Sequence, residues 1–584
     1  MKTPKYIFIV GGVMSGVGKG IAAASIAKIL QGKGFEVTAI KIDPYVNIDA
    51  GTMNPTEHGE TFVLDDGMEC DQDMGNYERF LGKDLSSANY MTTGSVYLSL
   101  INKERGLEFG GKCVEVVPHV PLEVIHRINK AAEKEKAEIV VVEVGGTVGE
   151  YQNILFLEAI RMLKVKNQND VVLALVSYLP LQGSDTELKT KPTQYAARTL
   201  NSAGLQPDII IARATVPLDK KRKEKIAFNC SVEEEAVISA PDVESIYEVP
   251  VNFENDKLSQ TILKKLNLKA RKSDLKEWKK FVDVIRTVKK PVRIGVVGKY
   301  FSTGSFILAD SYISVIEAIK HAAYVMKRKP EIVWLSADDF ELSAEKPTPL
   351  AGQARNKTQK NAEIKKNLQK LKQYDGIIIP GGFGSRGVEG KINVIKYLRE
   401  NKIPFLGLCY GMQLATVEYA RNMANLKNAN TTEVDLKTKY PVIDILPEQK
   451  IHMKEKKYGA TMRLGAYPAM IKNNTIAYNA YKNSRFESKK ESLRQDLGIP
   501  EDKLLIFERH RHRYEVNPEY ISKLEEKGLI FSGTSPDKRL MEILELPKKV
   551  HPFFVAAQFH PELKSRPLTA HPLFLEFMKV ATKK

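Results

Sequence analysis

The chain has 584 residues, and its composition, 43% hydrophobic and 27% charged, is that of an ordinary globular protein of about two to four domains. No apolar run approaches the roughly 18 residues of a membrane span, and the first apolar segment is too short for a signal peptide, so we expect a cytoplasmic protein with no membrane partner. The net charge of +17 suits polyanionic partners, but the basic residues are dispersed and no aromatic-basic RNA-binding module accompanies them, which favours nucleoside triphosphates over nucleic acid. The four cysteines lack metal-type spacing, which argues against a disulfide framework and a zinc site.

A glycine-rich loop follows the first predicted strand. Residues 6–10 are an apolar run, residues 11–20 carry the glycines, and residues 21–30 are good helix formers. A strand, loop and helix in this order direct backbone N–H groups and the positive end of the helix at one point, which suits a phosphate. The standard P-loop spacing fails, because Val13 stands in place of the first glycine and Gly20 in place of the metal-binding hydroxyl. On this motif alone, a tight strand-to-helix turn without a ligand is an open alternative.

The first half of the chain alternates apolar runs with helical patterns. The predicted strands span residues 35–44, 137–144, 170–176 and 208–212, and the predicted helices span residues 121–136 and 154–163. This alternation predicts a parallel sheet, with ligands bound beyond the carboxyl ends of its strands. Polar or glycine-rich segments follow two of these strands, at residues 145–149 and 184–194.

A second α/β unit begins after a predicted amphipathic helix at residues 273–288 and the break at residues 289–291. Its predicted strands span residues 292–298, 331–335, 376–380 and 404–408. Between them, residues 341–374 are rich in Lys, Gln, Asn and Ala, which indicates a partly helical, solvated insertion. We therefore expect domains at residues 1–270 and 292–584, joined by a helical linker at residues 271–291.

Cys409 lies in a G-x-C-x-G sequence between a predicted strand and a helix, the form of a nucleophile elbow. A helix N-terminus favours the thiolate, which is the nucleophilic species. Near the C-terminus, His560 and Glu562 follow another apolar run and supply a base and a carboxylate to orient it. Residues 380–384 add a glycine turn for an oxyanion hole. A lone cysteine after a buried strand is otherwise most often a small core residue.

These residues carry a resemblance: the second half resembles a class I glutamine amidotransferase domain, and nearly the whole chain resembles the CTP synthase family. The motifs that carry the match occur in order at residues 11–20, 41–45, 58–60, 76–80, 143–149, 189–194, 407–413 and 508–514. The resemblance implies two Rossmann-like domains: an N-terminal P-loop parallel sheet of the dethiobiotin-synthetase type, and a C-terminal, flavodoxin-like class I amidotransferase domain.

The family resemblance also implies an activity. A CTP synthase aminates UTP to CTP, with ATP as a substrate and ammonia from glutamine, through a 4-phosphorylated UTP intermediate, as the last step of de novo pyrimidine nucleotide synthesis. Ammonia would pass through an internal tunnel near Pro55 and His58. The resemblance further implies Mg²⁺, GTP as an allosteric activator, CTP as a feedback inhibitor, and a homotetramer.

Residue roles are implied by matching positions. In the glutaminase half, Cys409 would attack the glutamine amide, His560 would relay protons and Glu562 would orient the imidazole. The residues expected to bind glutamine are Gly382, Tyr410, Gly411, Met412, Gln413, Glu433 and Arg463. The residues expected to bind ATP are Ser15, Gly16, Val17, Gly18, Lys19, Gly20, Ile21, Lys41, Asp73, Pro241, Asp242 and Val243, with Asp73 and Glu143 as ligands of Mg²⁺. The residues expected to bind UTP or CTP are Ser15, Glu150, Tyr151, Gln152, Lys189, Thr190, Lys191, Pro192, Thr193, Gln194 and Lys225.

Two positions depart from the family pattern. Residues 149–152 read Gly-Glu-Tyr-Gln where the family commonly has Gly-Asp-Ile-Glu, which predicts a weaker or shifted response to CTP, and Tyr410 stands where leucine is common. The two histidines in residues 509–513 have a spacing that could suit a metal site, but no carboxylate or cysteine set completes such a site, so we interpret the pair as structural.

Two rival functions stay open at this point: another glutamine-dependent amidoligase, and a nucleotide-binding scaffold with a degenerate glutaminase half.

Overall fold

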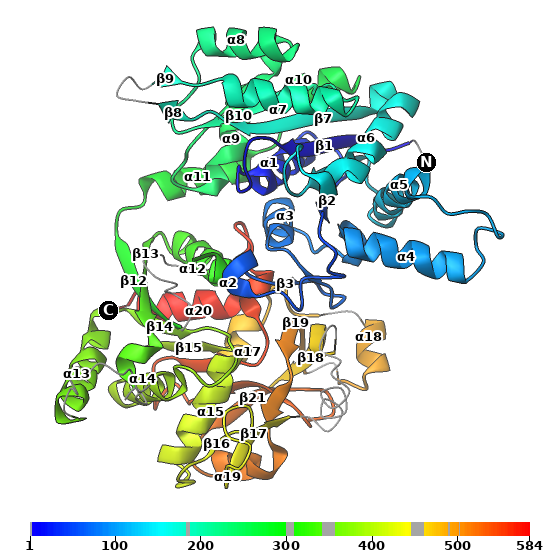
Figure 1. Ribbon diagram of the computed structural model, residues 1–584. Helices are drawn as coiled ribbons and strands as arrows, with labels where there is room; N and C mark the ends of the chain where they lie inside the picture. The colour runs from blue at the N-terminus through cyan, green and yellow to red at the C-terminus, as the bar shows by residue number, and fades with distance from the viewer. Residues whose placement is uncertain are drawn as a thin grey trace, which may run out of the picture. The chain divides into compact units, whose positions relative to one another are not determined.

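The computed structural model describes residues 3–182, 187–298, 309–341, 357–445, 461–488, 491–500 and 503–583. The chain forms two compact units (Figure 1). Unit 1 consists of Met1–Ala50 and Cys70–Arg286, and unit 2 consists of Gly51–Glu69 and Thr287–Lys584. Each unit is built on its own sheet, so the predicted pair of α/β domains is confirmed as a fold class.

Unit 1 contains a seven-stranded sheet in the order β11-β10-β7-β1-β6-β2-β5, and every neighbouring pair runs parallel. Its strands are β1 (Lys5–Gly11), β2 (Val37–Asp43), β5 (Tyr90–Thr92), β6 (Ile139–Val144), β7 (Val171–Tyr178), β10 (Ile209–Ala214) and β11 (Val237–Pro241). Its main helices are α1 (Lys19–Gly32), α3 (Asp73–Leu81), α4 (Thr93–Arg105), α5 (Val116–Lys134), α6 (Ile154–Lys166), α7 (Lys191–Ser202), α8 (Lys220–Cys230), α9 (Val249–Asn255), α10 (Leu258–Lys265) and α11 (Lys276–Thr287).

The central strands of unit 1 form where the sequence carries uninterrupted apolar runs. Every residue of β2 and of β6 is buried. Strands covered by helices on both faces read as continuous rather than alternating apolar segments, because neither face meets water. The predicted strands therefore match the observed ones, while the helix expected at residues 121–136 begins earlier, with α5 starting at Val116.

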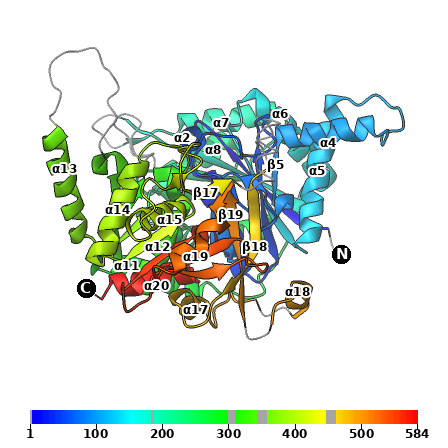
Figure 2. The same ribbon diagram turned by 90° about the horizontal axis from the view of Figure 1, so that it is seen from below.

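Unit 2 contains a nine-stranded sheet in the order β13-β12-β14-β15-β23-β22-β21-β18-β19. Its strands are β12 (Pro291–Gly298), β13 (Lys329–Ser336), β14 (Gly376–Ile379), β15 (Phe405–Leu408), β18 (Arg463–Ile471), β19 (Leu504–His512), β21 (Ile530–Thr534), β22 (Met541–Glu545) and β23 (Phe554–Ala557). The strands from β13 to β23 run parallel, and those from β23 to β19 run antiparallel. Figure 2 shows β18 and β19 side by side at the antiparallel edge.

Helices and a smaller sheet complete unit 2. The main helices are α12 (Ile313–Val325), α13 (Lys357–Lys370), α14 (Val388–Asn401), α15 (Tyr410–Asn422), α17 (Ile476–Tyr481), α18 (Glu491–Asp496), α19 (Ile521–Glu525) and α20 (Pro572–Ala581). The smaller sheet pairs β16 (Asn430–Thr431), β17 (Pro441–Ile445) and β20 (Tyr514–Val516). Within the predicted insertion at residues 341–374, α13 is helical as expected, and residues 342–356 lie outside the described part of the chain.

Gly51–Glu69 comes from the first part of the sequence but belongs to unit 2. It contains α2 (Pro55–His58) and β3 (Phe62–Val63). The backbone N–H of Glu60 donates to the carbonyl of Asp310 over 3.0 Å, and the N–H of Ala466 donates to the carbonyl of Asp65 over 2.9 Å. The predicted boundaries keep this segment with the first domain, whereas the compact units group it with the second.

Candidate active sites

Three neighbouring parallel strands of unit 2 end at one edge of the sheet and carry the predicted catalytic groups. β14 leads into the loop 380–387, β15 leads into Cys409, and β23 leads toward His560. The carboxyl ends of parallel strands meet at the same edge of a sheet, so residues far apart in sequence converge there. The order of β14, β15 and β23 in the sheet thus brings the loop 380–387, Cys409 and His560 to the same edge.

Cys409 sits in a strained turn between β15 and α15. Its φ of 49° and ψ of −99° are uncommon for a residue with a side chain, and such strain gathers at functional sites. The flanking glycines make the turn possible: a Cβ on Gly411 would lie 2.3 Å from the carbonyl oxygen of Ile379, and one on Gly407 would lie 2.8 Å from the Cβ of Ala556. Cys409 therefore has the geometry of a nucleophile elbow at a helix N-terminus.

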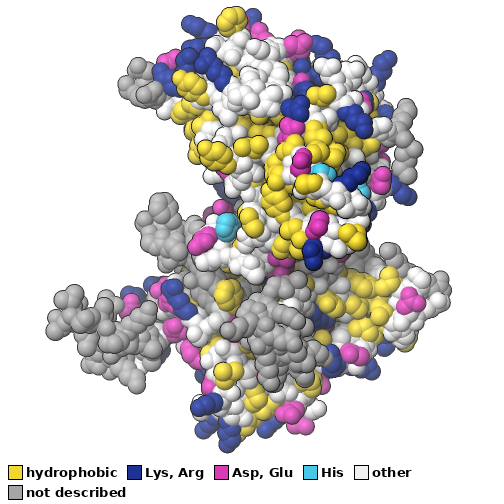
Figure 3. All heavy atoms as spheres, turned by 45° about the vertical axis from the view of Figure 1, so that its right-hand side comes forward, with side chains coloured by type: hydrophobic (Ala, Val, Ile, Leu, Met, Phe, Trp, Pro, Cys, Tyr) yellow, Lys and Arg dark blue, Asp and Glu magenta, His cyan; other side chains and the backbone are white. Residues whose placement is uncertain are grey.

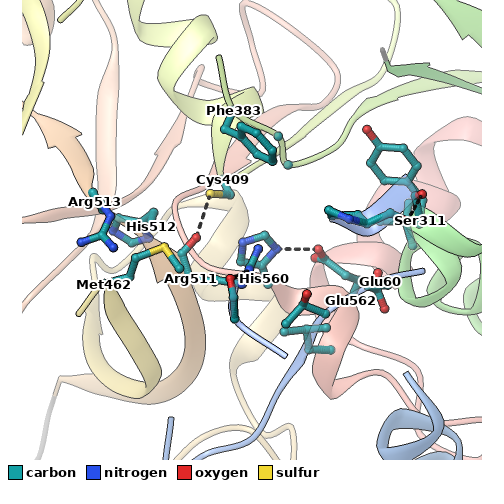
Figure 4. A pocket seen from close by; sticks show the side chains of 18 of the residues that line it. Glu60, Ser311, Phe383, Cys409, Met462, Arg511, His512, Arg513, His560 and Glu562 are labelled. Carbon is teal, nitrogen blue, oxygen red and sulfur yellow. Dashed lines mark hydrogen bonds and ion pairs between the residues drawn. The ribbon is translucent and has the colours of Figure 1, made fainter. Parts of the chain in front are cut away.

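His560 lies beside Cys409 and is paired with Glu562, whose Oε1 is 2.7 Å from the imidazole Nδ1 (Figure 4). Burial alone would lower the pKa of His560, but the charge of Glu562 and the neighbouring Cys409 outweigh it and raise that pKa well above its ordinary value. The Cys409 Sγ also lies 3.8 Å from the amide Nε2 of Gln558 and 4.0 Å from the carbonyl oxygen of Arg511. The imidazole is thus oriented by Glu562 and lies beside the thiol.

A cavity of about 1030 Å³ within unit 2 opens onto Cys409 and His560. Of the residues expected to bind glutamine, Gly382, Gln413 and Glu433 line this cavity. The Nε2 of Gln413 donates to the carbonyl of Tyr514 over 3.0 Å, while its buried Oε1 has no hydrogen-bond partner among the described residues. The carboxylate of Glu433 and the amide of Gln413 thus belong to the same cavity as Cys409.

The other expected glutamine ligands lie elsewhere. Tyr410, Gly411 and Met412 are buried in the first turn of α15, behind the nucleophile. Arg463 does not line the cavity: its guanidinium bonds to the buried carboxylates of Glu515, at 3.1 Å, and Glu542, at 2.7 Å. Figure 4 and the cavity lining place a different arginine, Arg513, beside the space. The role of Arg463 in binding glutamine stays a prediction, and in this structure its charge is balanced by two acidic side chains.

The glycine-rich loop of unit 1 lies between β1 and α1, as predicted. Val13 has a φ of 79°, and Gly16 and Gly18 have φ values of 72° and 94°, so the loop turns through the left-handed region. That conformation is strained for the β-branched Val13 and costs glycine little. The Nζ of Lys19 donates to the carbonyl of Gly146 over 2.7 Å, and burial lowers the pKa of Lys19.

Lys41, at the end of β2, is the centre of a buried charge cluster. Its Nζ lies 2.6 Å from Asp73, 2.9 Å from Glu143, 3.8 Å from Asp43 and 3.9 Å from Asp71. Burial would lower the pKa of Lys41, but these carboxylates, Asp73 first, raise it well above its ordinary value. Burial raises the pKa of Glu143. Four carboxylates thus gather around one ammonium, and oxygen ligands of this kind suit a hard cation.

Two family models match the chain: "CTP synthase N-terminus" over residues 5–268 and "Glutamine amidotransferase class-I" over residues 307–580. The CTP synthase of Methanocaldococcus jannaschii is 48% identical over 576 residues, 98% of each chain. The chain belongs to the CTP synthase family. The CTP synthase of Pyrococcus furiosus is 47% identical over 99% of this chain and 98% of its own. The solved glutaminase domain of Trypanosoma brucei CTPS with bound acivicin is 31% identical over 50% of this chain and 94% of its own, with a TM-score of 0.39.

The residues around Asp73 fit the magnesium ion expected of a CTP synthase. A Cβ on Gly20 would lie 1.9 Å from the Oδ1 of Asp73, so this carboxylate fills the space that a hydroxyl side chain takes in a standard P-loop. Mg²⁺ usually takes one or two protein carboxylates and completes its shell with phosphate and water oxygens. Asp73 and Glu143 supply such a pair, although the described residues contain no group of three or more His, Cys, Asp or Glu side chains arranged for a metal.

The segment expected near adenine follows β11 and is held by an arginine that the sequence analysis missed. Arg213, on β10, donates to the carbonyl of Pro241 over 3.2 Å and to the carboxylate of Asp242 over 2.8 Å. A Cβ on Gly18 would lie 3.5 Å from the Arg213 Nε, so the same side chain lies beside the glycine-rich loop. Val243 follows directly and is half-buried. Only the pairing of β10 with β11 brings these residues together.

The residues expected to bind UTP occupy four separate segments of unit 1, and the first of them, Ser15, lies in the glycine-rich loop between β1 and α1. Glu150 accepts a hydrogen bond from the N–H of Thr147 over 2.8 Å, and Tyr151 is 92% exposed. The segment 189–194 starts α7, with Thr190 and Gln194 buried, and Gln152 pairs with Glu150. The remaining member, Lys225, is exposed on α8, and residues 183–186 lie outside the described part of the chain.

Among the residues that the structure describes, no helix is long and apolar enough to cross a bilayer.

The histidine pair of residues 509–513, interpreted from the sequence as structural, lies on β19. His510 and His512 are buried, at 1% and 6% exposure, and each faces a buried carboxylate, Glu542 and Glu515 respectively. The histidine pair thus belongs to the buried ion network of Arg463.

Proposed function

We propose that this chain, as a CTP synthase, converts UTP to CTP with ATP and with ammonia released from glutamine. The observation that carries the proposal is the Cys409 elbow beside the His560–Glu562 pair at the cavity of unit 2, in a chain whose unit 1 carries a glycine-rich loop between β1 and α1. The two halves supply complementary chemistry: one releases ammonia, and the other activates a carbonyl oxygen as a leaving group.

Glutamine hydrolysis begins at Cys409. His560 takes the proton of the thiol as the sulfur attacks the side-chain amide carbon of glutamine and forms a tetrahedral oxyanion. Backbone N–H groups of Gly382 and Tyr410 stabilise this oxyanion. His560 then gives its proton to the departing nitrogen, which leaves as ammonia and yields a thioester. Water, deprotonated by His560, attacks the thioester and releases glutamate, and Glu562 keeps the imidazole oriented through both steps.

The glutamine head group is held by the far wall of the cavity. Glu433 accepts from the α-ammonium group, and the unpartnered Oε1 of Gln413 is a second acceptor. Arg513 binds the α-carboxylate, because a guanidinium matches both carboxylate oxygens and Arg513 lines the cavity. Arg463 is the alternative ligand for this carboxylate, and the two arginines are separated by substitution below.

In unit 1 the residues position ATP and neutralise charge. Backbone N–H groups of residues 15–21 and the Lys19 ammonium hold the phosphates, Lys41 supports them, and residues 241–243 lie against adenine. Asp73 and Glu143 hold Mg²⁺, which when bound supplies neutralisation of phosphate charge. UTP is held by Ser15, by residues 150–152 and 189–194, and by Lys225. The γ-phosphoryl group passes from ATP to the uracil 4-oxygen, and ammonia then displaces phosphate at C4.

The regulators and the assembly are part of the same proposal. We expect GTP to activate glutamine hydrolysis, CTP to inhibit with an altered response at residues 150–152, and four copies to assemble.

Apolar side chains gather on the face of unit 1 that carries α4 and α5 (Figure 3). Their exposed members are Leu98, Ile101, Leu107, Val116, Val117 and Leu122. A contiguous apolar surface of this kind supports contact between subunits.

A direct assay tests the function. CTP formation is followed by absorbance with ATP, UTP, and either glutamine or ammonium as donor. The proposal predicts CTP from both donors, with no product when UTP is omitted. Turnover of ATP that depends on a carboxylated acceptor rather than UTP would identify a different amidoligase, and nucleotide binding without turnover from either donor would identify a scaffold.

Three further expectations stay predictions: the domain boundaries at 270 and 292, a cytoplasmic location and the absence of nucleic-acid partners.

A further inference from the structure

Tyr410 follows the nucleophile directly and opens α15, yet its side chain points to the neighbouring loop. The ring is only 1% exposed, and the hydroxyl donates to the carbonyl oxygen of Gly384 over 2.9 Å. Gly384 belongs to the loop 380–387, which follows β14 and whose Gly382 lines the cavity. A single side chain therefore joins the nucleophile's helix to a loop that lines the same cavity.

The other side of Gly384 is bonded to the cavity's carboxylate. Its N–H donates to the Oε1 of Glu433 over 2.6 Å. Gly384 has a φ of 77°, and the loop also contains Gly381 and Gly382, so few side chains fix its backbone. The chain of contacts runs from the Tyr410 hydroxyl through the Gly384 backbone to the Glu433 carboxylate.

The Tyr410 ring is itself held from a third element. The ammonium nitrogen of Lys391, fully buried on α14, lies 5.5 Å from the ring centroid. A cation over an aromatic face is attracted by the ring's quadrupole, and more strongly when both are away from water. Because α14 begins directly after the loop 380–387, Lys391 and Gly384 fix the ring and the hydroxyl of Tyr410 together.

We propose that Tyr410 is a positioning residue for glutamine: its hydroxyl fixes Gly384 and thereby orients the Glu433 carboxylate that receives the substrate's ammonium group. The proposal rests on the glutaminase function proposed above. It assigns Tyr410 a role in substrate affinity through its side chain, in addition to the backbone N–H beside the oxyanion. Preorganised contacts of this kind lower the cost of ordering a loop when the substrate binds.

The test compares Tyr410→Phe, which removes only the hydroxyl, with wild type in glutamine hydrolysis. Loss of one neutral hydrogen bond should lower kcat/KM for glutamine by about three- to tenfold, mostly through KM. The rate at which iodoacetamide alkylates Cys409, which needs no glutamine pocket, should stay within about twofold. Tyr410→Leu, which also loses the ring, should raise the KM for glutamine at least as much.

A double-mutant cycle checks the route through Glu433. In a Glu433→Gln background, Tyr410→Phe should change the KM for glutamine by less than in wild type, because the two residues act in one chain. Fully additive effects, an unchanged KM, or a fall in kcat alone would each overturn the inference. If the wild-type protein releases no glutamate from glutamine, the proposed function fails instead, so the two failures are distinguishable.

Discussion

The two candidate sites of this chain balance charge in opposite ways. Around the cavity of unit 2, acids and bases pair: His560 with Glu562, and Arg463 with two buried glutamates. Around Lys41 in unit 1, four carboxylates meet one lysine, and burial with the nearby carboxylates raises the pKa of Asp71 well above its usual range. The charged groups around the cavity of unit 2 are thus paired with one another, whereas the cluster of unit 1 gathers carboxylates in the place where we propose that Mg²⁺ and phosphates bind.

The largest effect should come from filling the space that Asp73 occupies. Gly20→Ser restores the hydroxyl of a standard P-loop, but its Cβ would lie 1.9 Å from the Asp73 Oδ1, so the carboxylate must move. We expect ammonium-supported CTP formation to fall by roughly a hundredfold or more, because phosphoryl transfer depends on positioned charge. Glutamate release by unit 2 should continue.

A glycine with room around it provides the matched control. A Cβ on Gly149 would have its nearest neighbour at 3.9 Å, so Gly149→Ser meets no steric conflict; because Gly149 adjoins the residues proposed for UTP, the two variants are compared at saturating UTP, where Gly149→Ser should stay within about threefold of wild type. If Gly20→Ser is as active as this control, the modified loop does not depend on the close approach of Asp73.

The second prediction separates the two arginines of unit 2. Arg513→Ala should raise the KM for glutamine by about ten- to a hundredfold, because it removes charged hydrogen bonds to the substrate carboxylate. Arg463→Ala should instead destabilise unit 2 by about 3–5 kcal/mol, since it leaves Glu515 and Glu542 buried without their shared partner. Steady-state kinetics and chemical denaturation measure the two effects. A stable Arg463→Ala protein with a raised KM would restore the original expectation.

The third prediction concerns pH. The pKa of His560 is raised in the folded state by Glu562, so the pair contributes stability that is fully present below the unfolded pKa of about 6.5 and is lost as pH rises through the folded pKa. Glu562→Gln should therefore lower the denaturation midpoint of unit 2 most at pH 6 and least at pH 10. A difference between the two proteins that grows with pH would contradict this assignment of charge.

The smallest effect concerns the segment 51–69. The Nε of Arg511 lies 2.7 Å from the Oε1 of Glu69, which is almost fully buried. Glu69→Gln should cost about 1 kcal/mol of stability, because an amide still accepts a hydrogen bond but carries no charge. The surface pair of Arg161 and Glu158 in unit 1 supplies the control, and Glu158→Gln should leave the melting temperature unchanged. Equal shifts in both variants would show that the segment is not held by this pair.

Much of the fold could be predicted from the sequence, because a parallel strand that is buried on both faces is encoded by an uninterrupted apolar run. The same runs placed Cys409 and His560 after strands, although only the order β14-β15-β23 makes those ends neighbours. Arg463 and Arg513 could not be told apart in this way. The pairing of Arg463 with His512 across β18 and β19, and its contact with Glu542, depend on strand register and on a partner distant in sequence. No local pattern carries that information.

The most direct test of the account measures both activities in two variants side by side. Cys409→Ala should release no glutamate and form no CTP from glutamine, while forming CTP from ammonium at a rate near that of wild type. Gly20→Ser should show the reverse, releasing glutamate while forming little CTP from either donor. Glutamate release by Cys409→Ala, or loss of its ammonium-supported CTP formation, would contradict the division of chemistry between the two units.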